Sequence, residues 1–360
     1  MELVQQELIQ FPGERGVFVP LHFATYQELQ GMAAVAVDQA LNLLMHPENV
    51  ALFHDYLHRG ERLVPIVRSS PNFQRRPDLP SRVLLEMTSR CNLKCNMCPR
   101  QSLERPSIDM PKGLIKNCID ALDAFGLEGI WIFNLGESIL HPDFPELLDY
   151  VSEKKNLGMI WLSSNGRDLH EGVAEKIIRS QVTYMNMSVN ADNPETYSQI
   201  SPNTDWQRQI AHFHRFIDLK RASGRRTPFT RVQIIDQECA RDEIDAFLRR
   251  YAGYADILAV NTLEAFSQEV ESNQEYAQQR KRTESKSCKR IGRSDLFIFS
   301  NGETTLCGTD FNGKLALGNV KEMDIRAIWN SDFRRNLIAL NAEGRLNEVE
   351  LCRNCMDFDL

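Results

Sequence analysis

The pattern of apolar positions changes twice along the chain. In residues 1–64 the apolar residues recur at helical spacing. A capping box formed by Thr25 and Glu28 precedes the first of two such runs, which stops at Pro47. We therefore predict a mainly helical N-terminal domain over 1–64. The stretch that follows, residues 65–80, carries several prolines and arginines and is predicted to be a linker.

From residue 81 to residue 266, strand-like segments alternate with amphipathic helical segments. Apolar, β-branched or aromatic runs predict strands at 83–88, 130–135, 159–163, 183–189, 230–235 and 257–263. Helical spacing predicts helices between them at 112–124, 143–154, 169–179, 205–221 and 241–251. Strands separated by helices form parallel βαβ units, and six repeats are too few for an eight-fold barrel. The predicted fold class is therefore α/β, with a partial (βα)6 barrel as its main domain.

The last part of the chain is predicted to form a separate module. Residues 267–287 lose the apolar periodicity and are predicted to be an exposed connector. Residues 288–360 open with a predicted hairpin, in which the Asn301-Gly302 turn joins strands at 296–299 and 304–306. The expected order is thus helical domain, linker, barrel, connector and C-terminal module.

Composition and charge narrow the classes of function. Hydrophobic residues make up 42% and charged residues 25% of the 360 residues, which is ordinary for a globular protein. The 42 basic and 49 acidic residues give a net charge of −7, which argues against nucleic acid as a partner. The chain shows neither a basic segment followed by an apolar core at its start nor a run of about 18 apolar residues, so we expect no export signal and no membrane partner. We expect a cytoplasmic protein, in which its nine cysteines bind metal or do chemistry.

Three closely spaced cysteines follow the first predicted strand. Cys91, Cys95 and Cys98 lie in the segment Cys-Asn-Leu-Lys-Cys-Asn-Met-Cys, directly after strand 83–88. Active sites of parallel barrels collect at the C-terminal ends of the strands. A 4Fe–4S cluster normally takes four thiolates, so three cysteines leave one iron open for a small molecule. A zinc site formed by the three cysteines is the alternative.

The spacing of these cysteines, their position and the six βα repeats together resemble the radical S-adenosylmethionine (radical SAM) superfamily. The resemblance implies that the open iron binds SAM and that an electron cleaves the sulfonium. The resulting 5′-deoxyadenosyl radical abstracts a hydrogen from the substrate. It also implies an electron donor such as flavodoxin or ferredoxin.

Further residues match family positions that contact SAM. Gly136 and Glu137 lie in a turn that resembles the family's Gly-Gly-Glu-Pro turn, with its first Gly and final Pro replaced. Four residues that follow the third and fourth predicted strands fall where family members contact the SAM carboxylate and ribose: Ser164, Asn165, Ser188 and Asn190. The family usually has Asp at the position of Asn190. Capping of a loop is the alternative role for these pairs.

A second set of four cysteines lies in the C-terminal module, at Cys288, Cys307, Cys352 and Cys355. Four thiolates complete a 4Fe–4S cluster without an open iron, and structural zinc is the alternative. With Leu317–Val320 and Ile325–Ser331 between them, they resemble the SPASM/twitch extension of radical SAM enzymes. A full SPASM module carries seven cysteines and two auxiliary clusters, so four cysteines match the twitch form with one cluster. The resemblance covers residues 81–360.

The resemblance implies two possible functions, and a third hypothesis comes from another class of protein. Relatives with a twitch module oxidise or epimerise a carbinol carbon of sugars and aminocyclitols, or modify ribosomal peptides. The leading hypothesis is dehydrogenation or epimerisation of a carbinol carbon in a small molecule. The alternatives are epimerisation or cross-linking of a peptide whose leader binds residues 1–64, and a non-catalytic iron–sulfur or zinc scaffold.

Two cysteines remain outside the two sets. Cys118 lies on the apolar face of a predicted helix and is predicted to be a core residue. Cys239 follows the fifth predicted strand and should lie on the face that holds the first cysteine set. Because a thiol S–H bond is weaker than a carbinol C–H bond, Cys239 is a candidate hydrogen-atom donor to a carbon radical. The alternative is a small apolar residue packed under the loop.

Overall fold

The computed structural model describes most of the chain from residue 76 onward. The described residues are 8–10, 17–20, 76–225, 227–251, 254–255, 257–266, 287–353 and 355–357. The predicted N-terminal helices and all but the last residue of the predicted connector lie outside these ranges. No helix in the described ranges is both long enough and apolar enough to span a membrane.

The chain forms two compact units that do not follow the predicted domain order. Unit 1 comprises Met1–Ser69, Leu148–Glu153 and Met159–Thr262, and unit 2 comprises Ser70–Leu147, Lys154–Gly158 and Leu263–Leu360. The first two predicted barrel strands belong to unit 2, together with the C-terminal module, and the other four belong to unit 1. The domain boundaries predicted from the sequence stay predictions, because the two units are defined by contacts between residues and not by the order of segments along the chain.

Unit 1 contains the four later barrel strands, all parallel and close to their predicted positions. They are β5 (Met159–Ser164), β6 (Tyr184–Ser188), β7 (Phe229–Asp236) and β8 (Ile257–Thr262). The register places Met187, Val232 and Leu258 side by side on one face, where all three are fully buried. The register also pairs Asn186 with Arg231 on the other face. One face of this sheet is therefore apolar and the other is polar.

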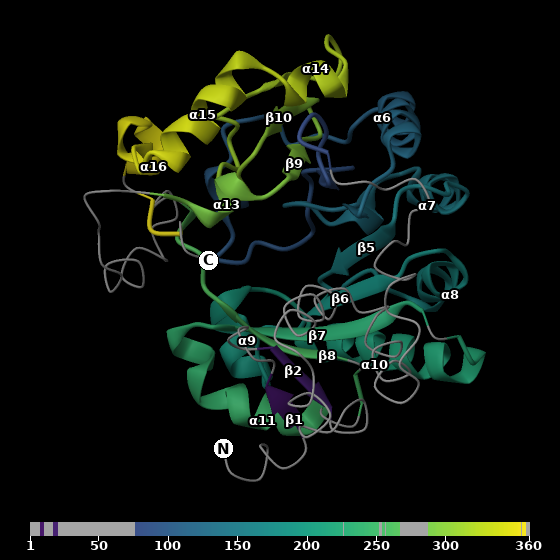
Figure 1. Cartoon of the computed structure of the whole chain (residues 1–360). Helices are drawn as coiled ribbons and strands as arrows, with labels where there is room; N and C mark the ends of the chain where they lie inside the picture. Colours follow the sequence, from purple (N-terminus) through teal and green to yellow (C-terminus); the bar gives the residue numbers. More distant parts are fainter. Residues whose placement is uncertain are drawn as a thin grey trace, which may run out of the picture. The chain divides into compact units, whose positions relative to one another are not determined.

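The helices of unit 1 include one that the sequence analysis did not predict. They are α8 (Glu171–Arg179), α9 (Pro194–Ile200), α10 (Trp206–Ser223) and α11 (Ile244–Tyr251). Figure 1 shows α8 and α10 side by side, and Arg215 forms an ion pair of 2.8 Å with Glu171 between them. The unpredicted helix is α9, which begins at Pro194 after Asn193 caps it by accepting from the backbone N–H of Thr196.

A short hairpin covers the edge of β8. Strands β1 (Leu8–Gln10) and β2 (Val17–Pro20) are antiparallel, and β2 pairs with β8 through Val17 and Ala259. The prediction of a mainly helical N-terminal region does not contain these strands. They are too short to produce a clear alternating pattern, and β8 offers the paired edge that stabilises them. The hairpin closes one edge of the unit 1 sheet.

The sheet of unit 2 mixes barrel strands with strands of the C-terminal module. Its order is β4 (Gly129–Trp131), β3 (Arg82–Leu85), β9 (Asp295–Ile298), β10 (Glu303–Thr305) and β11 (Gly318–Asn319). Val83 pairs in parallel with Ile130 of β4 on one side and with Leu296 of β9 on the other. The predicted hairpin is present as β9 and β10, with Gly302 at a φ of +90° in its turn. The parallel pairing of β9 with β3 was not predicted.

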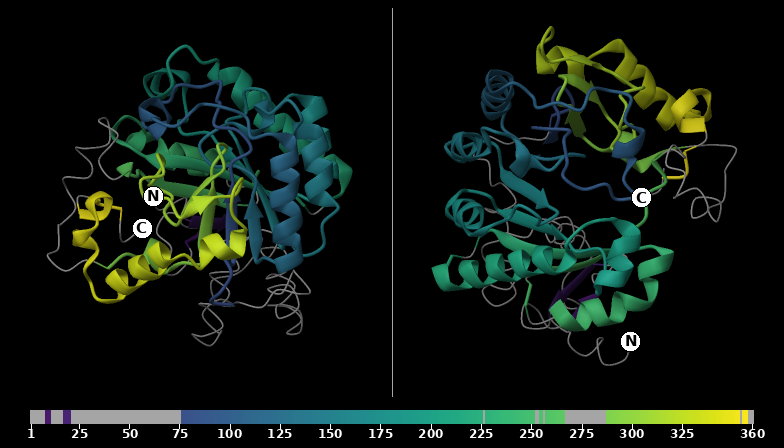
Figure 2. Two further views of the ribbon diagram at one scale, coloured as in Figure 1. Left: turned by 90° about the horizontal axis from the view of Figure 1, so that it is seen from above. Right: turned by 180° about the vertical axis from the view of Figure 1, so that it is seen from behind.

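The helices around this sheet are shown in two further views in Figure 2. They are α6 (Lys112–Phe125), α7 (Phe144–Ser152, which spans the division between the units), α13 (Lys289–Gly292), α14 (Ile325–Trp329), α15 (Asp332–Ala342) and α16 (Glu350–Arg353). Trp329 is fully buried and donates its indole N–H to the carbonyl of Pro77 at 3.0 Å. Cys118 is buried in α6, as predicted for a core residue.

Candidate active site

The three cysteines of the first set lie in one loop after β3. Cys91, Cys95 and Cys98 are each partly exposed, whereas Leu93 and Met97 between them are buried. The backbone N–H of Cys98 donates to the carbonyl of Cys95 at 3.1 Å, which forms a tight turn. The buried apolar side chains thus anchor the loop that carries the three cysteines.

A short helix after the loop holds its backbone in place. This 3-10 helix, Pro99–Ser102, follows the last cysteine. Arg100 donates to the carbonyl of Leu93 at 3.0 Å, and Gln101 donates to the carbonyl of Cys95 at 2.9 Å. These side chains fix the carbonyls of the loop, so its path does not depend on a bound group alone.

The thiols of this loop need a positive partner to ionise. Burial raises the pKa of the Cys91 thiol to about 11, and the negative charge of nearby Glu137 adds to the rise. Burial also raises the pKa of Cys98. Because thiolates are the ligands of iron, cluster binding must displace these protons.

The turn that follows β4 packs directly against the cysteine loop. A Cβ atom at Gly136 would overlap the carbonyl oxygen of Thr88 and would lie 2.8 Å from that of Arg90. The backbone N–H of Glu137 donates to the same Arg90 carbonyl at 2.9 Å, and the Glu137 side chain is buried. The structure therefore brings Gly136 and Glu137 to the cysteine loop, while their binding of SAM stays a prediction.

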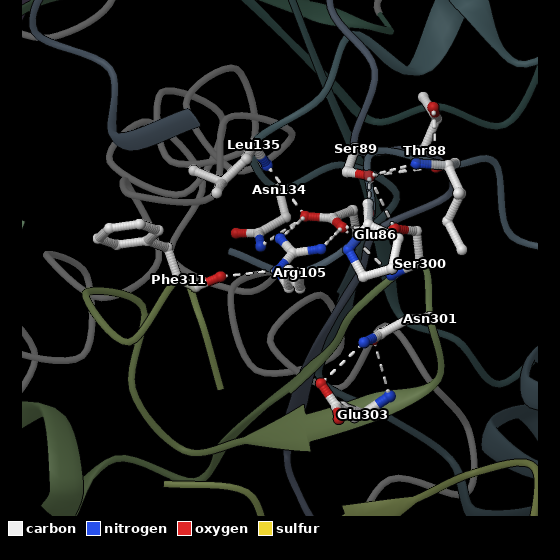
Figure 3. A network of polar contacts seen from close by, with 12 residues as sticks. Glu86, Thr88, Ser89, Arg105, Asn134, Leu135, Ser300, Asn301, Glu303 and Phe311 are labelled. Carbon is white, nitrogen blue, oxygen red and sulfur yellow. Dashed lines mark hydrogen bonds and ion pairs between the residues drawn. The ribbon is translucent and has the colours of Figure 1, made fainter. Parts of the chain in front are cut away.

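A buried carboxylate lies beneath both segments (Figure 3). Glu86 follows β3 and forms an ion pair with Arg105, at 2.5 Å and 2.8 Å to its two oxygens. It also accepts hydrogen bonds from Asn134 at 3.0 Å and from the hydroxyl of Ser300 at 2.9 Å. Neither Glu86 nor Arg105 was singled out from the sequence. The available signal was an acidic residue inside an apolar strand-like run.

The second cysteine set also lies in unit 2, around the start of α13. Asn341 brackets Cys288 by accepting from its backbone N–H at 2.6 Å and donating to its carbonyl at 3.2 Å. Cys307 and Cys355 are buried, and Cys352 is partly exposed. The backbone N–H of Asp357 donates to the Cys355 sulfur at 3.3 Å. Hydrogen bonds of this kind stabilise a thiolate ligand.

Charged groups surround Cys307. Burial raises its pKa to about 11, although the hydroxyl of Thr309, 3.1 Å from the sulfur, and the charge of Arg290 act to lower it. Arg290 forms an ion pair with Glu264 at 2.8 Å and donates to the carbonyl of Asp357 at 3.1 Å. The guanidinium therefore connects the segment of Cys307 with the segment that follows Cys355.

The donor sets suit iron–sulfur clusters. Among the described residues, no three histidine, cysteine or acidic side chains converge on the position of a single ion. The thiolates of a 4Fe–4S cluster do not converge in that way, because each binds a different iron. One cluster with an open iron needs three thiolates and one fully ligated cluster needs four, so the assignment of the two cysteine sets to such clusters stays a prediction.

The other predicted SAM contacts lie in unit 1, at the ends of β5 and β6. Ser164 accepts from the backbone N–H of Gly166 at 3.0 Å, and Asn165 accepts from that of Arg167 at 2.9 Å, so both side chains also shape their loop. Asn190 has a φ of +61°, and its buried Oδ1 accepts no hydrogen bond from any residue that the structure describes. A buried oxygen of this kind could accept a hydrogen bond from a bound ligand.

A polar layer, which was not predicted from the sequence, lies on one face of the unit 1 sheet. Arg231 donates to Asn186 at 2.8 Å, to Gln233 at 2.7 Å and to Asn261 at 2.7 Å. Ser188 accepts from Gln233 at 3.3 Å, which joins a predicted SAM contact to this layer. The signal in the sequence was the alternation of polar and apolar residues from Arg231 to Ile234.

Cys239 follows β7 as predicted. It lies in a 3-10 helix, Glu238–Glu243, and its side chain is exposed. Partial burial raises its pKa, and so does the charge of Glu243. The thiol is therefore protonated at neutral pH, as a hydrogen-atom donor must be, but its role stays a prediction.

Comparison with known proteins agrees with this geometry. Residues 85–227 match the radical SAM superfamily, and residues 288–356 match the SPASM iron–sulfur cluster-binding domain. The chain thus contains a radical SAM domain and a SPASM iron–sulfur cluster-binding domain, which confirms the predicted resemblance and the predicted fold class. The radical SAM domain implies SAM and a 4Fe–4S cluster, and the SPASM domain implies additional iron–sulfur cluster binding.

Individual relatives match over part of the chain. A tungsten-containing aldehyde ferredoxin oxidoreductase cofactor-modifying protein of Pyrococcus furiosus is 35% identical over 109 residues, 29% of this chain and 30% of its own length. The mycofactocin maturase MftC of Mycolicibacterium smegmatis is 24% identical over 201 residues, 55% of this chain and 48% of its own length. The matched segments thus span less than half of these curated relatives.

Two solved structures share the fold at low identity. SuiB of Streptococcus suis, bound to the precursor peptide SuiA, has a TM-score of 0.56 at 13% identity and covers 85% of this chain and 75% of its own. BtrN in complex with AdoMet and 2-DOIA has a TM-score of 0.51 at 16% identity and covers 77% of this chain and 93% of its own. At these identities the likeness concerns the fold.

Proposed function

We propose that this radical SAM enzyme dehydrogenates or epimerises a carbinol carbon of a sugar or aminocyclitol. The polar layer around Arg231 carries the proposal. Its amides, hydroxyls and guanidinium offer donors and acceptors on one face of the sheet, next to the predicted SAM contact Ser188. Such a surface suits a substrate with several hydroxyl groups, because specificity for hydroxyls depends on matching polar partners.

Further support comes from the relation to BtrN. The match covers 93% of that chain, whose structure contains both AdoMet and 2-DOIA. The four cysteines of the second set agree with a module that holds a single cluster. The substrate class of this chain is inferred from these features together with the polar layer.

Each cysteine set then has a distinct task. Cys91, Cys95 and Cys98 hold the cluster that binds SAM, and the second set holds the auxiliary cluster. The turn at Gly136 and Glu137 and the loop residues Ser164, Asn165, Ser188 and Asn190 bind SAM. When bound, SAM and the clusters supply the radical and the electron transfer. The residues around Arg231 bind and orient the hydroxyl groups of the substrate.

Modification of a ribosomal peptide is the second candidate. It is favoured by the likeness to SuiB, which was solved with its precursor peptide, and to the maturase MftC. Both candidates begin with abstraction of hydrogen from an unactivated C–H bond, so SAM cleavage alone does not distinguish them. The substrate that stimulates the cleavage and the product that forms must be identified. The match of residues 85–227 to the radical SAM superfamily argues against the third hypothesis, a non-catalytic scaffold.

The proposal is tested on protein prepared without oxygen. We expect about eight irons per chain, since two 4Fe–4S clusters hold four each, and 5′-deoxyadenosine after reduction with dithionite. Consumption of SAM should rise with aminocyclitols or sugars, and a ketone or an epimer should appear. If only peptides stimulate SAM cleavage, the carbohydrate proposal is wrong and the second candidate replaces it.

Variants separate the two cysteine sets. Cys91→Ala should abolish formation of 5′-deoxyadenosine, whereas Cys118→Ala, a core cysteine in α6, should leave it intact. Cys307→Ala should lose about four irons and form no product while still cleaving SAM. If Cys307→Ala does not fold, the less buried Cys352→Ala gives the same comparison. Loss of zinc instead of iron would contradict the second cluster.

A further inference from the structure

Glu86 connects four segments of unit 2 through one buried carboxylate. Its side chain has no exposed surface, and that of Arg105 is 3% exposed. The guanidinium of Arg105 donates to both carboxylate oxygens of Glu86, and the side chain of Asn134 donates to Oε2 at 3.0 Å. The backbone N–H and the hydroxyl of Ser300 donate to Oε1 at 3.1 Å and 2.9 Å. A carboxylate has about four lone-pair sites, so these donors saturate it.

The position of Glu86 links it to the predicted SAM site on two sides. Along the chain it precedes Cys91 by five residues, between β3 and the cysteine loop. Across space it holds Asn134 and the backbone N–H of Leu135, the latter at 3.5 Å, directly before Gly136. The same carboxylate therefore fixes the base of the cysteine loop and the start of the turn (Figure 3).

The C-terminal module completes the set of contacts. Ser300 follows β9 and also hydrogen-bonds the hydroxyl of Ser89 at 3.0 Å, two residues before Cys91. Arg105 donates to the carbonyl of Phe311 at 2.7 Å and lies 4.1 Å above the ring of Phe299. The residues that contact this ion pair, Phe299 and Ser300 on one side and Phe311 on the other, lie before and after Cys307 in the sequence. One network therefore reaches from the first cysteine set toward the second.

A buried ion pair of this kind contributes more to geometry than to stability. Its desolvation cost offsets most of its attraction, and apolar residues of similar volume often stabilise as well. A fully satisfied network does fix the relative positions of the segments that contribute to it. Positioning is important here, because a shift of about 1 Å in a bound reactant can cost about a hundredfold in rate.

We propose that Glu86 is a positioning residue for SAM. It sets the separation between the cysteine loop, which binds the cluster, and the turn at Gly136 and Glu137, and Ser300 of the C-terminal module secures that separation. The inference rests on the proposed role of this turn in SAM binding. It adds a residue that touches neither SAM nor iron but determines whether both halves of the site fit SAM together.

Glu86→Gln tests the proposal, because an amide of the same size places N–H donors against the donors of Arg105 or Asn134. The readout is the SAM concentration that half-converts the electron paramagnetic resonance signal of the reduced first cluster. We expect this concentration to rise at least tenfold, with the iron content of the wild type. Ser300→Ala, which removes one donor, should raise it less.

Asp295→Asn is the matched control. Asp295 forms an ion pair with Arg82 at 2.7 Å between the same two strands, β3 and β9, but at the ends away from the cysteine loop. Asp295→Asn should leave the SAM concentration that half-converts the signal at its wild-type value. If Glu86→Gln lowers the unfolding temperature and leaves SAM binding as in the wild type, Glu86 is structural and the proposal is wrong.

Two further results keep the outcome unambiguous. If Glu86→Gln does not fold, Ser300→Ala and Arg105→Lys decide, because a positioning role requires both to weaken SAM binding at full iron content. If SAM changes the signal in none of the proteins, including the wild type, the proposed function itself fails. If instead SAM changes the signal of the wild type and changes that of the variants equally, only the role of Glu86 is wrong.

Discussion

At the scale of single residues, Gly136 illustrates how closely two segments of the site approach each other. Its backbone lies against the carbonyls of Thr88 and Arg90, where a Cβ has no space. We expect Gly136→Ala to push the turn away from the cysteine loop and to weaken SAM binding at least tenfold. Equilibrium dialysis with labelled SAM measures the change.

Gly113→Ala provides the control for this substitution. Gly113 lies in α6, and no atom lies within 4 Å of the position of its added Cβ. Because Gly113 lies in the first turn of the helix, alanine should be tolerated there and should leave SAM binding unchanged. Equal SAM affinity in the two variants would show that the close approach at Gly136 is not needed for the site.

Cys239 is the predicted hydrogen-atom donor, and its role would distinguish epimerisation from dehydrogenation. Its exposed, protonated thiol follows β7, which also carries Arg231 of the polar layer. If it donates the hydrogen atom, product formed in deuterated water should carry one deuterium at the inverted carbon. Cys239→Ala should then consume SAM without returning an epimer, whereas Cys118→Ala should behave as the wild type. Normal product without solvent label in Cys239→Ala would assign the enzyme to dehydrogenation.

At the scale of secondary structure elements, the barrel strands could be predicted because short runs of apolar, β-branched or aromatic residues alternate with helical segments. β7 differs from its predicted range by one residue at each end. The predicted strand 83–88 is longer than β3, which ends at Leu85, although the backbone N–H of Glu86 still donates to the carbonyl of Ile298 in β9 at 2.9 Å. Short elements such as α9 and β11 carry too few residues to show a period.

In the candidate site, residues that belong to a local sequence motif could be predicted, whereas residues whose partners lie far away along the chain could not. The cysteines and the turn at Gly136 could be proposed from the sequence because they match short local motifs, and their binding roles stay predictions. Glu86 and Arg231 were missed because their partners are distant along the chain: Ser300 lies 214 residues from Glu86, and Asn261 lies 30 residues from Arg231. Local patterns do not contain such pairings.

At the scale of the molecule, the C-terminal module is part of the structure around the first cysteine set. Strand β9 pairs along the whole of β3, from Arg82 to Leu85. Without it, β3 would expose an edge of unpaired backbone groups, which promotes aggregation. Ser300 and the Phe311 carbonyl would also be lost from the network of Glu86 and Arg105.

This shared sheet makes the first cysteine site depend on the C-terminal module. A chain that ends before Cys288 should be insoluble or fail to bind SAM, since each buried polar group left without its partner costs about 1–3 kcal/mol of a total stability of about 5–15 kcal/mol. A full-length chain with Cys307→Ser and Cys355→Ser separates the strand from the cluster. It loses the auxiliary cluster but keeps β9, so it should stay soluble and still form 5′-deoxyadenosine. Solubility, iron content and SAM cleavage are measured on both. A truncated chain that cleaved SAM at the full-length rate would mean that β9 and Ser300 are dispensable for the first site.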